Sequence, residues 1–126
     1  AVMDARCNQF YNALFKIESG KIERLCEDRA ILKDDLIKEV ALLECGSLPI
    51  FAVGDGADIF YEAAKDKLDN LKLTPEHLKY QRATGVYKVA ENSETFVSAE
   101  DLLPTYLRLP QAERELKAKS LASERK

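Results

Sequence analysis

The stretch "FAVGDGADIFYEAA", residues 51–64, decides the fold prediction for this chain. An apolar run ends at Gly54-Asp55-Gly56, and an amphipathic helical pattern begins at once. A short, wholly apolar run is typical of a buried strand, so the pattern predicts a strand, a tight turn and a helix. The same layout can cradle a phosphate, because glycines let backbone amides approach it and the helix N-terminus favours an anion.

Two interpretations of Gly54, Asp55 and Gly56 are therefore open: a cofactor-binding nucleotide loop, or a turn that only connects two elements. In the second, the glycines supply unusual backbone angles, and Asp55 or Asp58 caps the helix. Asp55 also places a negative charge at the mouth of the loop, which disfavours a phosphate. We expect a structural turn, a vestige of a nucleotide loop, with no cofactor bound.

Upstream of the loop, the pattern predicts three strands in a meander and one helix. Residues 9–18 alternate along one strand. One face holds Tyr11, Ala13, Phe15 and Ile17 and the other holds Phe10 and Leu14, so both faces are expected to be covered. Ser19-Gly20 reads as a two-residue hairpin turn between this strand and the next. A helix then runs from Asp34 or Asp35, as the cap, to about residue 45. Its expected apolar stripe is Leu36, Ile37, Val40 and Leu43.

Downstream, the pattern predicts a helix over 57–70, a short edge strand over 71–73 and a helix over 81–91. The last helix is expected to face inward with Ala83, Val86, Tyr87 and Ala90. A right-handed crossover would join the meander to the strand at 50–53, giving a mixed sheet of about five strands with packed helices. This α/β order is the topology of a ribonuclease-H-like lobe, half of an actin-like ATPase. Residues 111–126 are charged and predict a frayed helix or a disordered tail.

Composition narrows the classes of function. The chain has 126 residues, enough for one domain, with a net charge of −3 and a pI of about 5.3. An acidic chain does not favour direct nucleic-acid binding, and one histidine with three scattered cysteines makes a metal site improbable. Thiols fit a reducing compartment, so we expect a cytoplasmic protein. No apolar run approaches the ~20 residues of a membrane span, and the first residues read as part of something longer.

Three stretches together carry a family resemblance. These are "DARCNQFYNALF" near the start, "FAVGDGAD" in the middle and "LLPTYLR" near the end, in this order and spacing. The chain resembles, over residues 1–110, the C-terminal lobe of the two-lobed TsaB (YeaZ) family, within the actin-like ATPase superfamily. Members take part in making threonylcarbamoyladenosine at position 37 of bacterial tRNA.

The resemblance implies a non-enzymatic partner subunit of that tRNA-modification complex. Family members support a catalytic paralogue, TsaD, and work with an ATPase, TsaE, mainly through helices of the other lobe. A runner-up is half of a nucleotide-dependent enzyme, an ATPase or the glycoprotease-like peptidase of an older family label. A third reading is a free-standing interaction module. We expect no catalytic residue here, and the apolar surface that normally meets the other lobe predicts a weak homodimer.

Other residues give weaker predictions. The turn formed by residues 4–9 lacks glycine, so we expect side chains to fill the space that a phosphate needs there. Arg6 would pair with a neighbouring carboxylate or, less readily, hold an anion. His77 reads as a surface loop histidine rather than a base, and Cys7 as a passive thiol. Tyr106 and Arg108 are candidate partner-binding residues. The alternative is that this segment packs on its own sheet, with Leu103 buried.

Overall fold

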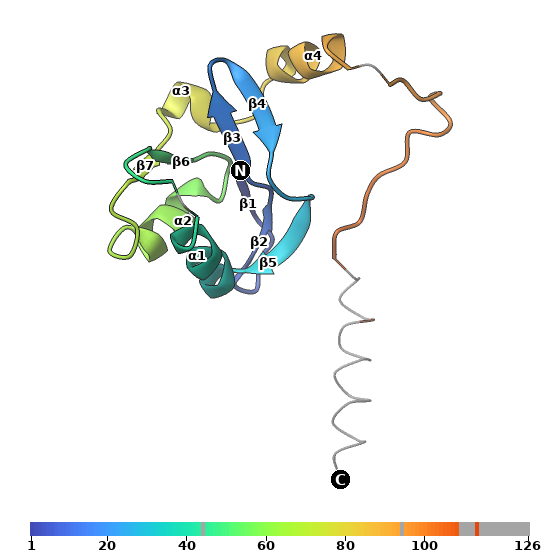
Figure 1. Cartoon of the computed structure of the whole chain (residues 1–126). Helices are drawn as coiled ribbons and strands as arrows, with labels where there is room; N and C mark the ends of the chain where they lie inside the picture. The colour runs from blue at the N-terminus through green and yellow to red at the C-terminus, as the bar shows by residue number, and fades with distance from the viewer. Residues whose placement is uncertain (44, 94, 109–112, 114–126) are drawn as a thin grey trace.

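The computed structural model describes residues 1–43, 45–93, 95–108 and 113. Figure 1 shows a body of short strands and helices, with a C-terminal segment that leaves this body after α4. The elements are β1 (Val2–Asp4), β2 (Gln9–Asn12), β3 (Phe15–Glu18), β4 (Lys21–Arg24), β5 (Arg29–Leu32), α1 (Lys33–Ala41), β6 (Ile50–Ala52), α2 (Ala57–Ala64), β7 (Leu71–Leu73), α3 (Glu76–Lys79) and α4 (Ala83–Glu91). The predictions for 111–126 lie outside the described residues, apart from 113.

The described strands form three small sheets rather than one five-stranded sheet. Strands β1, β2 and β5 are antiparallel, β3 and β4 form a hairpin, and β6 pairs with β7 in parallel. The Val2 amide donates to the Val53 carbonyl at 2.8 Å, which holds β1 beside the end of β6. The protein is thus a small mixed α/β structure, and the ribonuclease-H-like lobe stays a prediction.

The core lies between the β1–β2–β5 sheet and helices α1 and α2. The Phe10 and Phe60 rings meet edge to face, with centroids 6.0 Å apart, a favourable geometry for two aromatic rings. The predicted apolar stripe of α1 is confirmed at Leu36, Ile37 and Val40, which are all buried. The buried cluster is Val2, Phe10, Leu36, Ile37, Val40, Ala52, Ala57, Phe60, Ala64, Leu68 and Leu71.

The single strand expected over 9–18 is wrong. It breaks at Ala13 and Leu14, where the Leu14 amide donates to the Cys26 Sγ and the Leu14 carbonyl accepts from Leu25. The chain therefore leaves the three-stranded sheet and starts the separate hairpin. The expectation that both faces are covered is confirmed at Phe10 and Ala13, which are buried, but it is wrong at Ile17, which is 72% exposed.

Three predictions about the ends of helices and the burial of a strand need correction. Helix α1 begins after Leu32 and has no side-chain cap, so neither Asp34 nor Asp35 is the expected cap. Both lie in the first turn, where their negative charges interact favourably with the helix dipole. Helix α2 ends at Ala64 rather than near residue 70, although Leu68 and Leu71 beyond it are buried as expected. Strand β6 is not covered on both faces, because Phe51 is 53% exposed.

The C-terminal third departs furthest from the predictions. The four-residue helix α3 was not expected at all. Helix α4 forms where a helix was predicted, but it buries none of its residues, so its expected inward face is exposed. Within the described residues, no helix has both the length and the apolar character that crossing a membrane requires.

Candidate functional site

The backbone amides of the 54–56 loop are already hydrogen-bonded within the chain. The Gly54 N–H donates to the Lys79 carbonyl at 2.9 Å, and the Gly56 N–H donates to the Val2 carbonyl at 3.2 Å. A phosphate cradle needs amide hydrogens that point at the anion. These two amides are instead used to fasten the loop to β1 and to the end of α3.

Both glycines are required by the close approach of other backbone and ring atoms. Gly54 has a φ of +114°, and a Cβ on it would lie 2.1 Å from the Val2 carbonyl oxygen. A Cβ on Gly56 would lie 3.0 Å from both the Asp4 amide nitrogen and a Phe10 ring carbon. The glycine pair therefore lets β1 and the core ring pass close to the loop.

Asp55 does not cap α2, which corrects one expectation. The N-cap of α2 is Gly56, without a side-chain hydrogen bond. The Asp55 Oδ1 instead accepts a hydrogen bond from the Asp4 amide at 3.1 Å. Asp55 thus joins the loop to the beginning of the neighbouring turn, and its charge faces that turn.

Sequence reasoning missed Lys79, which supports the loop from the other side. Its carbonyl accepts the Gly54 hydrogen bond, and its Nζ lies 3.0 Å from Asp58 Oδ2 and 2.7 Å from Glu76 Oε2. The Lys79 side chain is only 9% exposed. Its pKa is raised by its hydrogen bonds to Glu76 and, next, to Asp58. The signal was Glu76 and Lys79 at i and i+3 directly after Pro75, a spacing typical of one helical turn.

The 4–9 turn has an unusual backbone. Arg6, Cys7 and Asn8 have φ values of 60°, 50° and 60°, three left-handed residues in a row without a glycine. Each such residue costs on the order of 1–2 kcal/mol. Hydrogen bonds hold the turn: the Ala5 amide donates to the Gln9 carbonyl, and the Gln9 amide donates to the Arg6 carbonyl, both at 3.1 Å.

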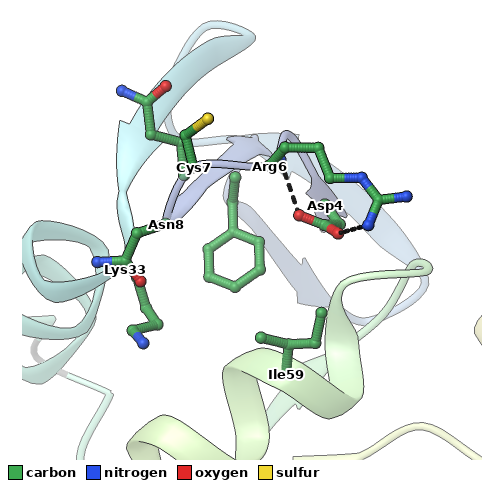
Figure 2. A pocket seen from close by; sticks show the side chains of 8 residues that line it. Asp4, Arg6, Cys7, Asn8, Lys33 and Ile59 are labelled. Carbon is green, nitrogen blue, oxygen red and sulfur yellow. Dashed lines mark hydrogen bonds and ion pairs between the residues drawn. The ribbon is translucent and has the colours of Figure 1, made fainter.

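A cavity of about 250 Å³ lies between this turn and α2 (Figure 2). The sequence predicted that side chains would fill the space beside the turn. The cavity shows that part of this space is open. Figure 2 places Lys33 and Arg6 on either side of the cavity, with Ile59 on the α2 side. The Arg6 guanidinium is paired with Asp4 at 3.2 Å, which confirms one of its two expected roles. The lining residues are Asp4, Arg6, Cys7, Asn8, Gln9, Phe10, Lys33 and Ile59.

These lining residues offer no arrangement for nucleophilic catalysis. No histidine is among them, and His77 lies exposed on α3, a helix rather than the expected loop. Cys7 is exposed at the cavity, while the Cys26 Sγ accepts a backbone hydrogen bond from Leu14. Over the described ranges, no group of three histidine, cysteine or acidic side chains could hold a metal ion.

The two candidate partner-binding residues have different surroundings. Tyr106 is 86% exposed, and its role stays a prediction. Arg108 is half-buried, and its guanidinium donates a hydrogen bond to the Ala5 carbonyl, which attaches the C-terminal segment to the 4–9 turn. Leu103, expected to be buried, is 76% exposed. Residues 102–106 are therefore exposed rather than packed on the sheet, and only Leu107 and Arg108 are half-buried.

The structure brings three of the sequence-derived candidates together and leaves a fourth apart. The 54–56 loop and the 4–9 turn meet through the hydrogen bond between Asp4 and Asp55, and Arg108 binds the same turn. Tyr106 is exposed and lies apart from them. Hydrogen bonds within the chain therefore hold the loop, the turn and Arg108 together. Comparisons with protein-family models, curated proteins and solved structures found no match to the chain.

Proposed function

We propose that this chain is the C-terminal lobe of a TsaB-type protein, a non-enzymatic partner in the synthesis of threonylcarbamoyladenosine on tRNA. The observation that carries the proposal is that the amides of the 54–56 loop are already hydrogen-bonded within the chain. Gly54 and Gly56, which would have to present amides to a nucleotide, donate them to the Lys79 and Val2 carbonyls. A lobe whose loop is fastened in this way supports a neighbouring lobe more readily than it turns over ATP.

The 4–9 turn gives a second line of support. Its three left-handed residues carry side chains, where a phosphate-binding turn would use glycine to let the anion approach. Asp4 pairs with Arg6, which reduces the positive charge available to an anion. Together with the resemblance of the three sequence stretches, these features favour a scaffold role over a nucleotide-dependent enzyme.

The proposed fold of the lobe is ribonuclease-H-like. It is supported by the antiparallel β1–β2–β5 sheet, by the parallel β6–β7 pair, and by the hydrogen bond from Val2 to Val53 that joins them. In the proposed assembly the whole two-lobed protein binds the catalytic paralogue TsaD and the ATPase TsaE. A net charge of −3 favours protein partners over direct binding of tRNA.

A capture experiment tests the proposal. This chain and the full two-lobed protein are immobilised separately, and each is offered purified TsaD and TsaE. We expect the two-lobed protein to retain TsaD and this chain to retain little, because the principal partner surface belongs to the other lobe. Failure of the two-lobed protein to retain TsaD would refute the scaffold role.

Retention by this chain alone would favour the free-standing module instead. In that case Tyr106→Ala, at a residue that is 86% exposed, should abolish capture if the 102–108 stretch is the docking segment. Phe51→Ala is the matched control, since Phe51 is also exposed but lies on β6.

Calorimetry with ATP and magnesium separates the scaffold from the enzyme alternative. We expect no micromolar binding by this chain, because the loop amides are occupied. A micromolar signal lost on Lys33→Ala, at the edge of the cavity, would favour the nucleotide-dependent enzyme half.

A further inference from the structure

The backbone of the 4–9 turn is strained and needs contacts that hold it. Its three consecutive left-handed residues, Arg6, Cys7 and Asn8, all carry side chains, and a left-handed conformation is favourable chiefly for glycine. Strain of this kind persists where the surrounding structure over-determines the backbone. One such contact comes from α1, where the Lys33 amide donates to the Asn8 carbonyl at 3.0 Å.

Arg108 adds a contact from a distant part of the chain. Its guanidinium donates a hydrogen bond to the Ala5 carbonyl, across a sequence separation of 103 residues. Residues 95–106 before it are all exposed, and the burial of the C-terminal segment begins only at Leu107. The contact made by Arg108 can therefore open without unpacking the core, unlike the contacts made by the neighbouring strands and helices.

Two buried polar atoms beside this contact are complementary. Among the described residues, the buried side-chain atoms without a hydrogen-bond partner in the chain are Gln9 Oε1, an acceptor, and Arg108 Nε, a donor. The Nε is bonded to the same carbon as the Nη1 that binds Ala5, so it lies beside the turn. Gln9 is also next to Ala5, because the Ala5 amide donates to the Gln9 carbonyl at 3.1 Å. Since buried polar atoms rarely stay unpaired, one hydrogen bond between these two would satisfy both.

We propose that Arg108 acts as a latch on the turn: its Nη1 binds the Ala5 carbonyl, its Nε binds Gln9 Oε1, and together these bonds keep the turn in its left-handed conformation. The C-terminal segment is thereby coupled to the candidate site, because the Asp4 amide of the same turn donates to Asp55 in the glycine loop. When Arg108 is withdrawn, the turn relieves its strain and changes conformation. The proposal does not rest on the TsaB-type function.

NMR of the full chain tests the latch, because φ-dependent scalar couplings report the backbone of the folded protein whatever its stability. In the wild type, the couplings of residues 6–8 should report positive φ. Arg108→Ala should shift these couplings toward the values of negative φ, since the strained turn relaxes when the latch is lost. Arg82→Ala removes an exposed arginine next to α4 and is the matched control, which should leave the couplings unchanged. Unchanged couplings in Arg108→Ala would overturn the proposal.

Urea unfolding then tests the hydrogen bond between Arg108 and Gln9. Gln9→Leu and Arg108→Ala should each lower the midpoint urea concentration. The double variant should lower it by clearly less than the sum of the two shifts, because both changes remove the same bond. Gln9→Leu combined with Arg82→Ala should give a simple sum, as expected for residues that share no contact. A simple sum for Gln9→Leu with Arg108→Ala would show that the two buried atoms do not pair, and the latch would be refuted.

Discussion

At the scale of single residues, Gly54 decides how the candidate site is built. The sequence allowed it to be either a ligand-approach glycine or a turn glycine. The structure places the Val2 carbonyl where its side chain would be, at 2.1 Å from an ideal Cβ. The glycine therefore serves the approach of β1. The same Val2 carbonyl accepts the Gly56 N–H, which is then not available to a ligand.

Gly54→Ala should destabilise the protein by about 3 kcal/mol or more, because it combines a steric overlap with a left-handed backbone. Gly46→Ala is the control, since Gly46 also has a positive φ, of 55°, but has open space around it. That change should cost about 1 kcal/mol. Urea unfolding measures both, and equal costs would contradict the overlap with Val2.

Lys79 is a second residue whose role follows from its surroundings. Its pKa is raised in the folded protein above the ordinary value of 10.5, chiefly by Glu76 and then by Asp58. A raised lysine pKa contributes stability that is fully present below the unfolded pKa and is lost as the pH rises through the folded value. The contribution should therefore be constant at neutral pH and decline only above about pH 10.5.

Lys79→Met should lower the melting temperature at pH 7, and the gap to the wild type should narrow above pH 10.5. Thermal unfolding followed by circular dichroism over this range measures the gap. Lys72→Met, at an exposed residue on β7, is the control and should show a small gap at every pH. A gap for Lys79→Met that stays constant through high pH would contradict the ion-pair role.

At the scale of elements, local signals predicted the turns well. Ser19 and Gly20 have φ values of 51° and 79°, the pair of left-handed residues that a type I′ hairpin needs, as expected from Ser-Gly. Helix α4 shows the opposite case. Its amphipathic pattern was correct for a helix but wrong for burial, because periodicity says which side is apolar and not what lies against it.

Hydrogen exchange should separate α4 from the helices of the core. We expect the amides of α4 to exchange through opening with a free energy near zero, because no buried side chain holds the helix. The amides of α1, which carries Leu36, Ile37 and Val40 in the core, should be protected close to the global stability. Equal protection of the two helices would contradict the exposure of α4.

At the scale of the whole molecule, one aromatic contact ties the sheet to the helices. Phe10 on β2 and Phe60 on α2 meet edge to face and are 2% and 3% exposed. The same ring of Phe10 lies against Gly56, so the core and the candidate site share atoms. Stability of the fold and the geometry of the 54–56 loop are therefore coupled.

Phe60→Ala should cost about 3–5 kcal/mol, through lost burial and the cavity that it leaves. Denaturant unfolding measures this value, with Phe96→Ala as the control, since Phe96 is 80% exposed and should change stability by less than about 0.5 kcal/mol. A small cost for Phe60→Ala would mean that the sheet and α2 do not form one core.

The sequence by itself determined the elements whose signals are local. The Ser19-Gly20 turn, the buried stripe of α1 and the strand–loop–helix order around Gly54 depend on residues close together in the chain. Backbone dihedral preferences and helical periodicity act over a few residues, so they can be read directly. The same signals also placed Leu68 and Leu71 in the core although the helix itself ends earlier.

Only the tertiary structure decided what each surface meets. The break between β2 and β3 depends on Cys26, twelve residues from Leu14; the loop amides are occupied by Val2 and Lys79; and Arg108 reaches Ala5 across the chain. Such contacts join residues that are distant in sequence, and no local pattern specifies the partner. Burial and hydrogen-bond satisfaction are properties of the packed molecule, which is why the role of the loop and the exposure of α4 emerged only with the fold.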